Sequence, residues 1–183
     1  MTSTATPLNE PLMNGGFEAC KLPVDGLVEA PAAFALVALR PMPSRTQITL
    51  HDCVEGWSAI GKWKGLQNAH LLEQVRPLPN ARFVVLRCAD SMDDPTPGTD
   101  STYYDSVDMD YAHHVQIGLA YELNDTPLPV NNGAPLRAPI ERQLGYKLVK
   151  YQMRVELVER FDQIRGGQGG DWEDNGYESY AGI

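Results

Sequence analysis

The chain has 183 residues, of which 43% are hydrophobic and 21% charged. One domain of that size buries a core without disulfides or metals, and the composition excludes a disordered or low-complexity chain. The formal net charge of -9 argues against a nucleic-acid or anionic-membrane partner. No apolar run approaches the ~18 residues needed to span a bilayer, so no transmembrane segment is expected.

The acidic residues and the cysteines have distinctive distributions. Nine acidic residues occur between Asp90 and Asp125 without any Lys or Arg, and the rest of the chain is electrically balanced. That segment is either a binding surface or a solvated loop. The chain has only three cysteines, Cys20, Cys53 and Cys88, which is an odd number. We therefore expect no disulfide scaffold, and at least one thiol that is free or a ligand.

Local patterns predict many short strands and few helices. Residues 1–19 have no hydrophobic period and predict an N-terminal arm, with one domain over 20–183. In the first half of the chain we expect two short strands over 22–28 around a turn at Asp25-Gly26, helical turns at 32–39, a strand at 45–51 and a helix at 67–75. A buried strand at 81–88 and an acidic loop should follow. The second half should contain a strand at 117–123 before a turn at Asn124-Asp125, and further strands at 136–140 and 147–159. Strands and helices do not alternate as they do in βαβ units, so the predicted fold class is α+β, mainly β.

The run DCVEGWSAIGKWKG, residues 52–65, places a cysteine at the end of a predicted strand. On this pattern Cys53 is either a buried small apolar residue or a thiolate that binds a soft metal or attacks a substrate. The chain has no CxxC or HxxxH zinc motif. A Cys-His catalytic pair could use His51, His70, His113 or His114, and the spacing selects none of them.

Two later runs could also contribute to a site. Residues 131–151 gather Arg137, Arg142, Lys147 and Lys150 near glycines, which indicates either a phosphate site or a solvated pair of strands. The chain contains no Walker or GxGxxG motif, so a nucleotide fold is not supported. The tail after residue 166 is rich in glycine and then aromatic, and it either closes over the domain or forms a rim of the active site.

Six separated motifs occur in order along the chain: DGLVEAP, MPSRTQITLHDCVEGWSAIGKW, LAYELN, GAPLR, ERQLGYK and WEDNGYESYAGI. Together they resemble the molybdopterin-binding domain of the sulfite oxidase family, over residues 24–183. The similarity is to a bacterial branch of stand-alone oxidoreductases related to the periplasmic methionine sulfoxide reductase catalytic subunit. The resemblance implies a sulfite-oxidase-type fold and a Mo-molybdopterin cofactor.

The resemblance also implies roles for individual residues. Cys53 would ligate molybdenum through its thiolate, a soft donor suited to this metal. The residues implied to hold the pterin and its phosphate are Asn132, Arg137, Lys147 and Lys150, with backbone N–H groups of residues Lys147, Leu148, Val149 and Lys150, Cys88 near the pterin, and Asn14 in an Asn-Gly contact. Tyr103 fits a substrate-pocket YxxS context, and Tyr104 is the neighbouring candidate. Each is either such a hydroxyl or a half-buried strand aromatic.

Three departures from the family pattern are visible. Asn132 stands where close relatives usually have His, and Cys20 stands where they have Trp. The chain also begins later than its relatives, without their twin-arginine signal. The family's immunoglobulin-like dimer domain has no counterpart, so we expect a monomer. The resemblance implies a periplasmic protein; the absence of a signal segment favours the cytoplasm if the chain is complete.

The favoured hypothesis is a molybdenum-pterin oxidoreductase that moves an oxygen atom to or from a small substrate. Because the chain has no CxxCH motif, its electrons would be exchanged with a separate haem protein. The alternatives are a molybdopterin-binding module without turnover and a redox-inactive β domain with a buried Cys53. The acidic segment favours a neutral acceptor over sulfite, or a basic docking partner such as a cytochrome.

Overall fold

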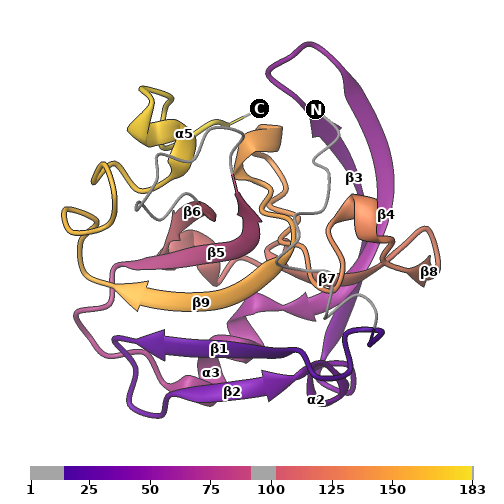
Figure 1. Ribbon diagram of the computed structural model, residues 1–183, viewed down its shortest axis with the longest axis horizontal. Helices are drawn as coiled ribbons and strands as arrows, with labels where there is room; N and C mark the ends of the chain where they lie inside the picture. The colour runs from indigo at the N-terminus through magenta and orange to yellow at the C-terminus, as the bar shows by residue number, and fades with distance from the viewer. Residues whose placement is uncertain (1–14, 92–101, 183) are drawn as a thin grey trace.

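Two β-sheets form the body of the molecule (Figure 1). The computed structural model describes residues 15–91 and 102–182. The five-stranded sheet has the order β2 (Ala32–Ala35), β1 (Lys21–Gly26), β9 (Gln152–Val158), β5 (Phe83–Ser91), β6 (Thr102–Asp108). The four-stranded sheet has the order β3 (Ser44–Asp52), β4 (Ser58–Gln67), β7 (Gly118–Leu123), β8 (Thr126–Pro127). Only β1 and β9 pair in parallel among these neighbours; the other named pairs are antiparallel.

Helices in the described residues are short. They are α2 (Leu36–Leu39), α3 (Asn68–Val75), α4 (Met109–Ala112), α5 (Asp171–Asp174) and the 3₁₀ turns η2 (Val130–Asn132) and η3 (Gly145–Lys147). The longest, α3, buries Leu71, Leu72 and Val75 and ends at Arg76, which has a left-handed φ of 52°. Within residues 15–91 and 102–182, no helix combines the length and the apolar character needed to cross a membrane.

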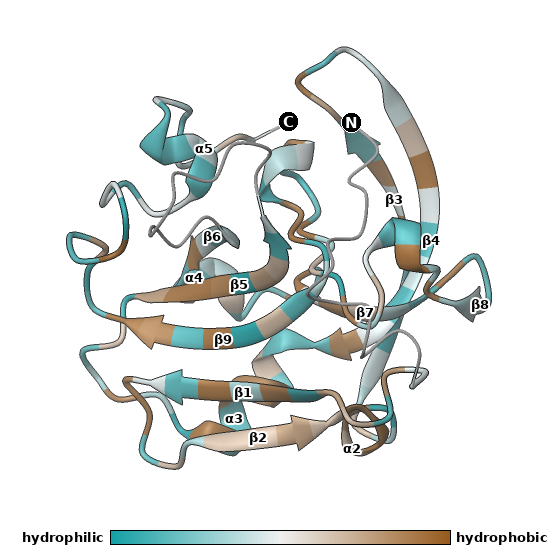
Figure 2. Cartoon of the chain, viewed as in Figure 1, coloured by the Kyte–Doolittle hydropathy of each residue, from teal (hydrophilic) through white to brown (hydrophobic). Residues whose placement is uncertain are grey.

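The core lies between the two sheets and α3. Val84 and Val155, on β5 and β9, are fully buried, and so is Leu72 on α3. All three belong to one apolar cluster. Figure 2 shows most of β5 as apolar, whereas apolar and polar residues alternate along β9. A smaller apolar cluster contains Trp63 of β4 and Leu128. Burial of this apolar surface is the main term that stabilises the fold.

A long hairpin of β3 and β4 projects from the body (Figure 1). Its register runs from Ser44 opposite Leu66 to Asp52 opposite Ser58, so a five-residue loop joins the strands. Alternation along the strands leaves Ile48 and Ile60 about 70% exposed, at 69% and 72%, while Trp63 is buried. The loop that begins at Cys53 is thereby carried to the end of this hairpin.

The mainly β class and several elements agree with the sequence analysis. Strand β3 contains the predicted strand 45–51, β5 overlaps 81–88, α3 differs from 67–75 by one residue, and β7 differs from 117–123 by one residue. The predicted turn at Asn124-Asp125 joins β7 to β8, with positive φ values of 51° and 63° at the two residues. These elements have strong local patterns, so local sequence was sufficient to predict them.

Other predictions were wrong. Residues 22–28 do not form a hairpin around Asp25-Gly26, because β1 continues to Gly26 and pairs with β9. Residues 32–35 form β2, and only 36–39 are helical. Residues 136–140 form no strand and make only isolated bridges, one to β7 at Ala120↔Arg137 and one to the residue before it at Ile117↔Ile140. The last strand begins at Gln152 rather than 147. Tertiary pairing overrode local preference in each case.

The remaining expectations concern the arm and the acidic loop. Most of the predicted arm lies outside the described residues, and 15–19 form a turn before Cys20. The prolines of the acidic stretch, Pro95 and Pro97, also lie outside the described residues. The stretch after them is not a loop, because 102–108 pair with β5 as β6. The sequence analysis missed β4 and β6 because their strands contain glycines or carboxylates.

We predict that Gly26→Ala destabilises the fold more than Gly56→Ala. Both glycines have nearly the same positive φ, 83° and 85°, so each substitution carries the left-handed penalty of about 1–2 kcal/mol. At Gly26 a Cβ would also lie 2.2 Å from the Leu157 carbonyl oxygen, whereas nothing lies within 4 Å at Gly56. Thermal unfolding of both variants measures the difference. Equal losses in melting temperature would contradict the close approach of β1 to β9.

Candidate functional site

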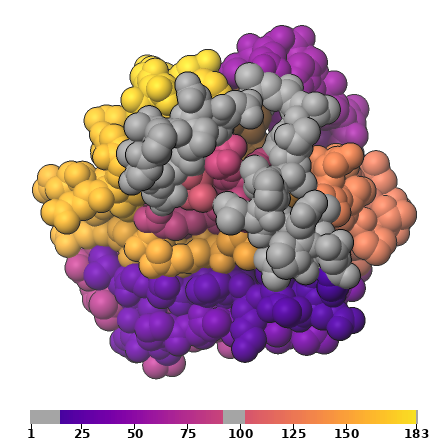
Figure 3. Space-filling view, in the orientation of Figure 1, coloured from indigo at the N-terminus to yellow at the C-terminus, as the bar shows by residue number. Residues whose placement is uncertain are grey.

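A cavity of about 570 Å³ opens where the end of the β3–β4 hairpin faces the segment around 132–150 and the chain's C-terminal part. Figure 3 shows the hairpin and the C-terminal segment along the same edge of the molecule. The residues that line the cavity come from five parts of the chain. The first is 51–63, the second is Cys88 to Ser91 together with Tyr103, and the third is Leu123 with Asn124. The last two are 132–150 and Trp172 with Tyr177. Such a volume is ample for a small ligand or an organic cofactor.

Cys53 lies at the mouth of the hairpin loop and faces this cavity. Its backbone N–H donates to the Trp57 carbonyl at 3.0 Å, and its carbonyl accepts from Gly56 N–H at 3.0 Å. Gly56 supplies the positive φ that closes this tight turn. The Cys53 thiol is free and half-buried. The turn therefore holds a single sulfur donor at a defined position beside the cavity.

Arg137 is a buried cation at the polar end of the cavity. Its side chain is only 6% exposed, and its guanidinium lies 5.0 Å from the centroid of the Trp63 ring. Nη1 donates to the Asn132 carbonyl at 3.2 Å. Among the described residues, Nε has no hydrogen-bond partner and no carboxylate pairs with the side chain. Burial lowers the pKa of Arg137 to about 10, so the guanidinium remains charged at pH 7.

His51 forms the adjacent wall. Its ring stacks on Trp57 with a centroid distance of 5.2 Å, and Arg137 Nη2 lies 3.4 Å from its Nδ1. Burial, with the charges of Arg137 and Lys150, lowers the pKa of His51 to about 4. The imidazole is therefore neutral, with Nδ1 as acceptor and the proton on Nε2. A Cβ on Gly145 would lie 2.7 Å from that Nε2, so glycine leaves room for the ring.

Lys150 and Asn132 complete the polar end. Lys150 Nζ lies 3.5 Å from the Asn131 carbonyl, and burial with the nearby Arg137 charge lowers its pKa. The side chain of Asn132, at the end of η2, is half-buried and lines the cavity. Within the described chain, the N–H groups of Val149 and Lys150 donate to no other residue, unlike those at 147 and 148. Two cations and free donors favour an anionic ligand.

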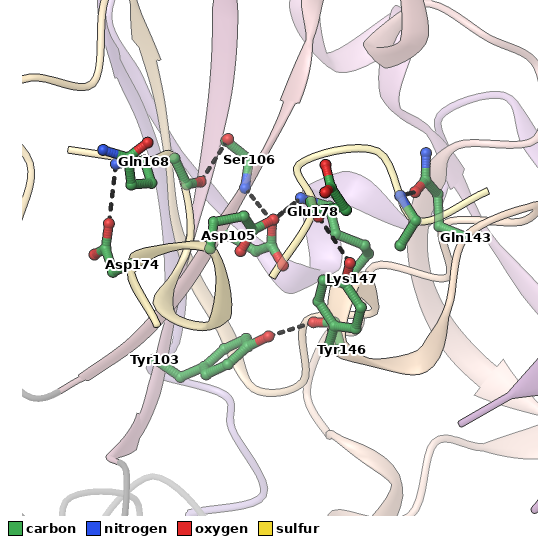
Figure 4. Close-up of polar contacts among 12 residues, drawn as sticks. Tyr103, Asp105, Ser106, Gln143, Tyr146, Lys147, Gln168, Asp174 and Glu178 are labelled. Carbon is green, nitrogen blue, oxygen red and sulfur yellow. Dashed lines mark hydrogen bonds and ion pairs between the residues drawn. The ribbon is translucent and has the colours of Figure 1, made fainter. Parts of the chain in front are cut away.

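The opposite wall is aromatic. The Tyr103 hydroxyl donates to the Tyr146 carbonyl (Figure 4), and the Tyr146 hydroxyl donates to the Glu178 carbonyl at 2.7 Å. Trp172 and Tyr177 pack with ring centroids 5.0 Å apart, and Tyr177 meets Tyr146 edge-on at 5.3 Å. This wall presents large apolar surfaces with few charges, and it suits a neutral group.

The structure brings most of the predicted site residues to one cavity. The predicted residues that line it are Cys53, Cys88, Tyr103, Asn132, Arg137, Leu148 and Lys150. Cys88 is 6% exposed, its Sγ lies 3.4 Å from the Asp90 carbonyl, and burial raises its pKa to about 12. It is therefore a protonated thiol and a poor metal ligand at neutral pH. Asn14 lies outside the described residues.

Three predicted side chains do not reach the cavity. Tyr104, on the other face of β6 from Tyr103, donates to Asp174 Oδ2 at 2.6 Å. The expected phosphate contact of Lys147 is not available to its side chain, because Nζ is buried in ion pairs with Asp105 and Glu173. Val149 lies in the core, fully buried. The Lys147 N–H donates to the Leu144 carbonyl, so of the described backbone N–H groups at 147 and 149 only that of Val149 could serve a ligand.

Sequence reasoning did not select several lining residues. His51 was one of four equal histidine candidates, yet it alone among them lines the cavity. The Trp63 ring packs against the Arg137 guanidinium, and the Tyr146 carbonyl accepts a hydrogen bond from the Tyr103 hydroxyl. The local sequence around Trp63 and Tyr146 does not indicate either role. Trp172 and Tyr177 confirm that the aromatic tail docks against the domain as a rim of the cavity. Only their unusual aromatic content pointed to that position.

The described part of the acidic segment is neither a single surface nor a loop. Asp105 is fully buried, and Asp108 caps α4 by accepting from Tyr111 N–H at 2.7 Å. Glu122 pairs with Lys64 at 3.1 Å, and Asp125 pairs with Lys62. Among the described members of the segment, Asp90 alone lines the cavity. The local charge of the cavity therefore depends on Arg137 and Lys150 more than on the net charge of the chain.

These groups fit a metal carried by an anionic organic cofactor. The described residues contain no group of three or more His, Cys, Asp or Glu side chains that could hold a metal. The protein offers one thiolate donor, so further donors would have to come from the cofactor. The partnerless Nε of Arg137, Lys150 and the free N–H groups fit its phosphate. Fold and cavity thus define a mainly β domain with a cavity suited to an anionic organic cofactor.

Comparison with known families identifies that cofactor class. Residues 11–164 match the oxidoreductase molybdopterin binding domain. The chain belongs to this family and is a domain of the molybdopterin-dependent oxidoreductases, as the motifs of the sequence indicated.

Two curated relatives are similar over most of the chain. The chain is 36% identical over 162 residues to the putative protein-methionine-sulfoxide reductase subunit YedZ1 of Azospira oryzae, covering 88% of this chain and 55% of that protein. It is 34% identical over 142 residues to the protein-methionine-sulfoxide reductase catalytic subunit MsrP of Ralstonia nicotianae, covering 75% of this chain and 43% of that protein. The chain thus spans about half the length of these relatives.

A solved structure shares the fold. The sulfane dehydrogenase SoxCD from Paracoccus pantotrophus superimposes with a TM-score of 0.68 at 19% sequence identity. The match covers 78% of this chain and 39% of that one. The likeness supports the two-sheet architecture.

We predict that Arg137 gives the cofactor-free protein affinity for phosphate. Saturating inorganic phosphate, at about 100 times its Kd, should stabilise the wild type by roughly 2.7 kcal/mol. Arg137→Met should lose most of that gain, because it removes the buried cation and its partnerless N–H. Arg142→Met is the control, since Arg142 is exposed and lines no part of the cavity. Thermal unfolding with and without phosphate, at constant ionic strength, measures the gain; an equal gain in both variants would contradict the assignment.

Proposed function

We propose that this chain is the catalytic domain of a molybdopterin-dependent reductase that removes an oxygen atom from a sulfoxide. The observation that carries the proposal is the joint position of the free Cys53 thiol and the buried, carboxylate-free Arg137 on one cavity. A thiolate for a soft metal and a cation for a phosphate are needed together only when the metal arrives on a phosphorylated cofactor.

Each residue of the cavity has a proposed task. Cys53 would hold the molybdenum, and the bound Mo-molybdopterin supplies the two-electron redox chemistry. Arg137, Lys150 and the N–H groups of Val149 and Lys150 would hold the phosphate, while Asn132 would contact the pterin. His51, neutral and fixed by Arg137, would present its Nε2 proton along the cavity wall. These groups orient the cofactor and exclude water from it.

The aromatic wall supports a neutral substrate. Tyr103, Tyr146, Trp172 and Tyr177 would enclose an uncharged group beside the reacting centre. Tyr103 would donate its hydroxyl hydrogen bond to a sulfoxide oxygen in place of the Tyr146 carbonyl. Both relatives carry protein-methionine-sulfoxide reductase names, so methionine sulfoxide is the proposed substrate. Sulfite is less suited, because its charge would lie against apolar rings.

The overall reaction consumes one sulfoxide, two protons and two electrons and yields one thioether and one water. We infer that the electrons come one at a time from a separate haem protein, because the chain has no haem-attachment motif. We also infer a periplasmic location and a monomeric state for the domain. These three inferences rest on the family resemblance stated above.

We predict that Cys53→Ser abolishes sulfoxide reduction and lowers bound molybdenum to a small fraction of the wild-type content. The reason is that a serine hydroxyl is a harder donor and is not ionised at neutral pH. Metal content by elemental analysis and reduction of methionine sulfoxide with a reduced viologen dye measure the two effects. The fold should persist, since Cys53 lies in an exposed turn rather than in the core.

Cys88→Ser is the matched control for this experiment. It replaces a second thiol of the same cavity, and the serine hydroxyl can still donate to the Asp90 carbonyl. Its metal content should stay close to that of the wild type. Full activity in Cys53→Ser would refute the proposed metal ligand. Bound pterin without turnover in the wild type would favour a molybdopterin-binding module instead.

A further inference from the structure

Lys147, Asp105 and Glu173 form a buried ion cluster beside the cavity (Figure 4 shows Lys147 and Asp105). Lys147 Nζ donates to Asp105 Oδ1 and to Glu173 Oε1, and all three side chains are at most 1% exposed. Asp105 Oδ1 also accepts from Ser106 N–H at 2.6 Å. Within the described residues, Asp105 Oδ2 and Glu173 Oε2 have no hydrogen-bond partner. Two carboxyl groups therefore share one ammonium group in a dry environment.

This cluster is not explained by stability alone. Moving charges out of water is costly, and well-packed apolar residues often stabilise a fold as well as a buried ion pair does. Two partnerless carboxylate oxygens add to that cost. The energetic cost of this buried cluster indicates that it has a role other than stabilising the fold.

The cluster joins the three elements that build the aromatic wall. Asp105 lies on β6 two residues after Tyr103, so both side chains are on the same face of the strand. Lys147 follows Tyr146 directly at the end of η3. Glu173 follows Trp172 directly in α5. Each member thus lies within two residues of one cavity-lining ring, and movement of the cluster would move all three rings.

We propose that Lys147, Asp105 and Glu173 are positioning residues that fix Tyr103, Tyr146 and Trp172 around the substrate end of the cavity. The proposal deepens the proposed function, because it assigns how the substrate wall of that enzyme is held. None of the three side chains lines the cavity itself. They act through the rings next to them.

The charge state of the cluster follows from its surroundings. The titratable groups around Asp105 are Lys147 from η3, Glu173 from α5, and Tyr103 and Tyr146, with Asp171 of α5 also acting on Tyr103. Burial raises the pKa of Asp105 to about 8, against the opposing effect of Lys147. Burial likewise raises the pKa values of Tyr146 and Cys88 to about 12 and that of Tyr103 above its usual range. At pH 7 Asp105 therefore keeps its proton, and the cluster gains a buried negative charge when Asp105 ionises.

The first test is steady-state kinetics of the holoenzyme, with rates divided by molybdenum content. Lys147→Met should lower kcat/KM for methionine sulfoxide by about 100-fold, as expected when a reacting group is misplaced by roughly 1 Å. Glu173→Gln should show a smaller loss that falls mainly on KM. Glu156→Gln is the control: it removes a half-buried pair with Arg87, 2.7 Å long, away from the cavity. It should leave kcat/KM unchanged.

The pH profile distinguishes positioning from a purely structural role. In the wild type, kcat/KM should fall above pH 8, because Asp105 then ionises and adds a buried negative charge to the cluster. Asp105→Asn cannot ionise at this position, so its own value at pH 7 should persist to pH 9. Variants that lose melting temperature but keep wild-type kcat/KM and its pH profile would overturn the proposal.

A second readout needs no activity and no cofactor. The chain has three tryptophans, so the indole N–H resonance of Trp172 can be assigned with Trp172→Phe. In the cofactor-free protein this resonance should titrate with a midpoint near pH 8 in the wild type and in Glu156→Gln, and not in Asp105→Asn. An indole that does not titrate in the wild type would refute the coupling of cluster and wall. A titrating indole in a protein inactive on sulfoxides would refute only the proposed reaction.

Discussion

The contact of the buried Arg137 guanidinium with its surroundings organises the whole cavity. The group rests on Trp63 of β4, lies beside His51 of β3 and donates to the Asn132 carbonyl. It thereby links the projecting hairpin, which carries Cys53, to the segment that carries Lys150. A cation buried without a carboxylate is costly unless a ligand supplies the negative charge. The Cys53 thiol and the two cations Arg137 and Lys150 consequently face the same cavity.

The cavity has two ends of different chemistry. The polar end contains cations, a neutral imidazole and free backbone N–H groups, and the other end is a wall of aromatic rings. The carboxylates that give the chain its negative charge are largely engaged elsewhere, in a helix cap, in surface ion pairs and in the Lys147 cluster. The net charge of the chain is therefore a poor guide to the electrostatic potential in this cavity. The sign of the local field is determined by which few charges line the cavity.

Prediction from sequence succeeded where a local pattern was sufficient. Alternating β-branched residues identified β3, helical spacing identified α3, and Asn124-Asp125 identified the hairpin turn. It failed where long-range pairing decided the structure: Gly26 approaches Leu157 from a strand more than a hundred residues away, and 136–140 remain isolated bridges. Tyr103 and Tyr104 show the same limit at the site. Their order in β6 is evident, but the face that meets the cavity depends on how β6 packs.

The sequence by itself determined the family, the mainly β class, the thiol and the positively charged segment, because motifs and residue types persist whatever their surroundings. The tertiary structure alone decided which of these groups act together. It selected His51 from four histidines, took the Lys147 side chain into a buried cluster with Asp105 and Glu173, and brought Trp172 to the cavity. Burial and distance give these groups their chemistry, and both arise only when segments far apart in sequence pack against one another.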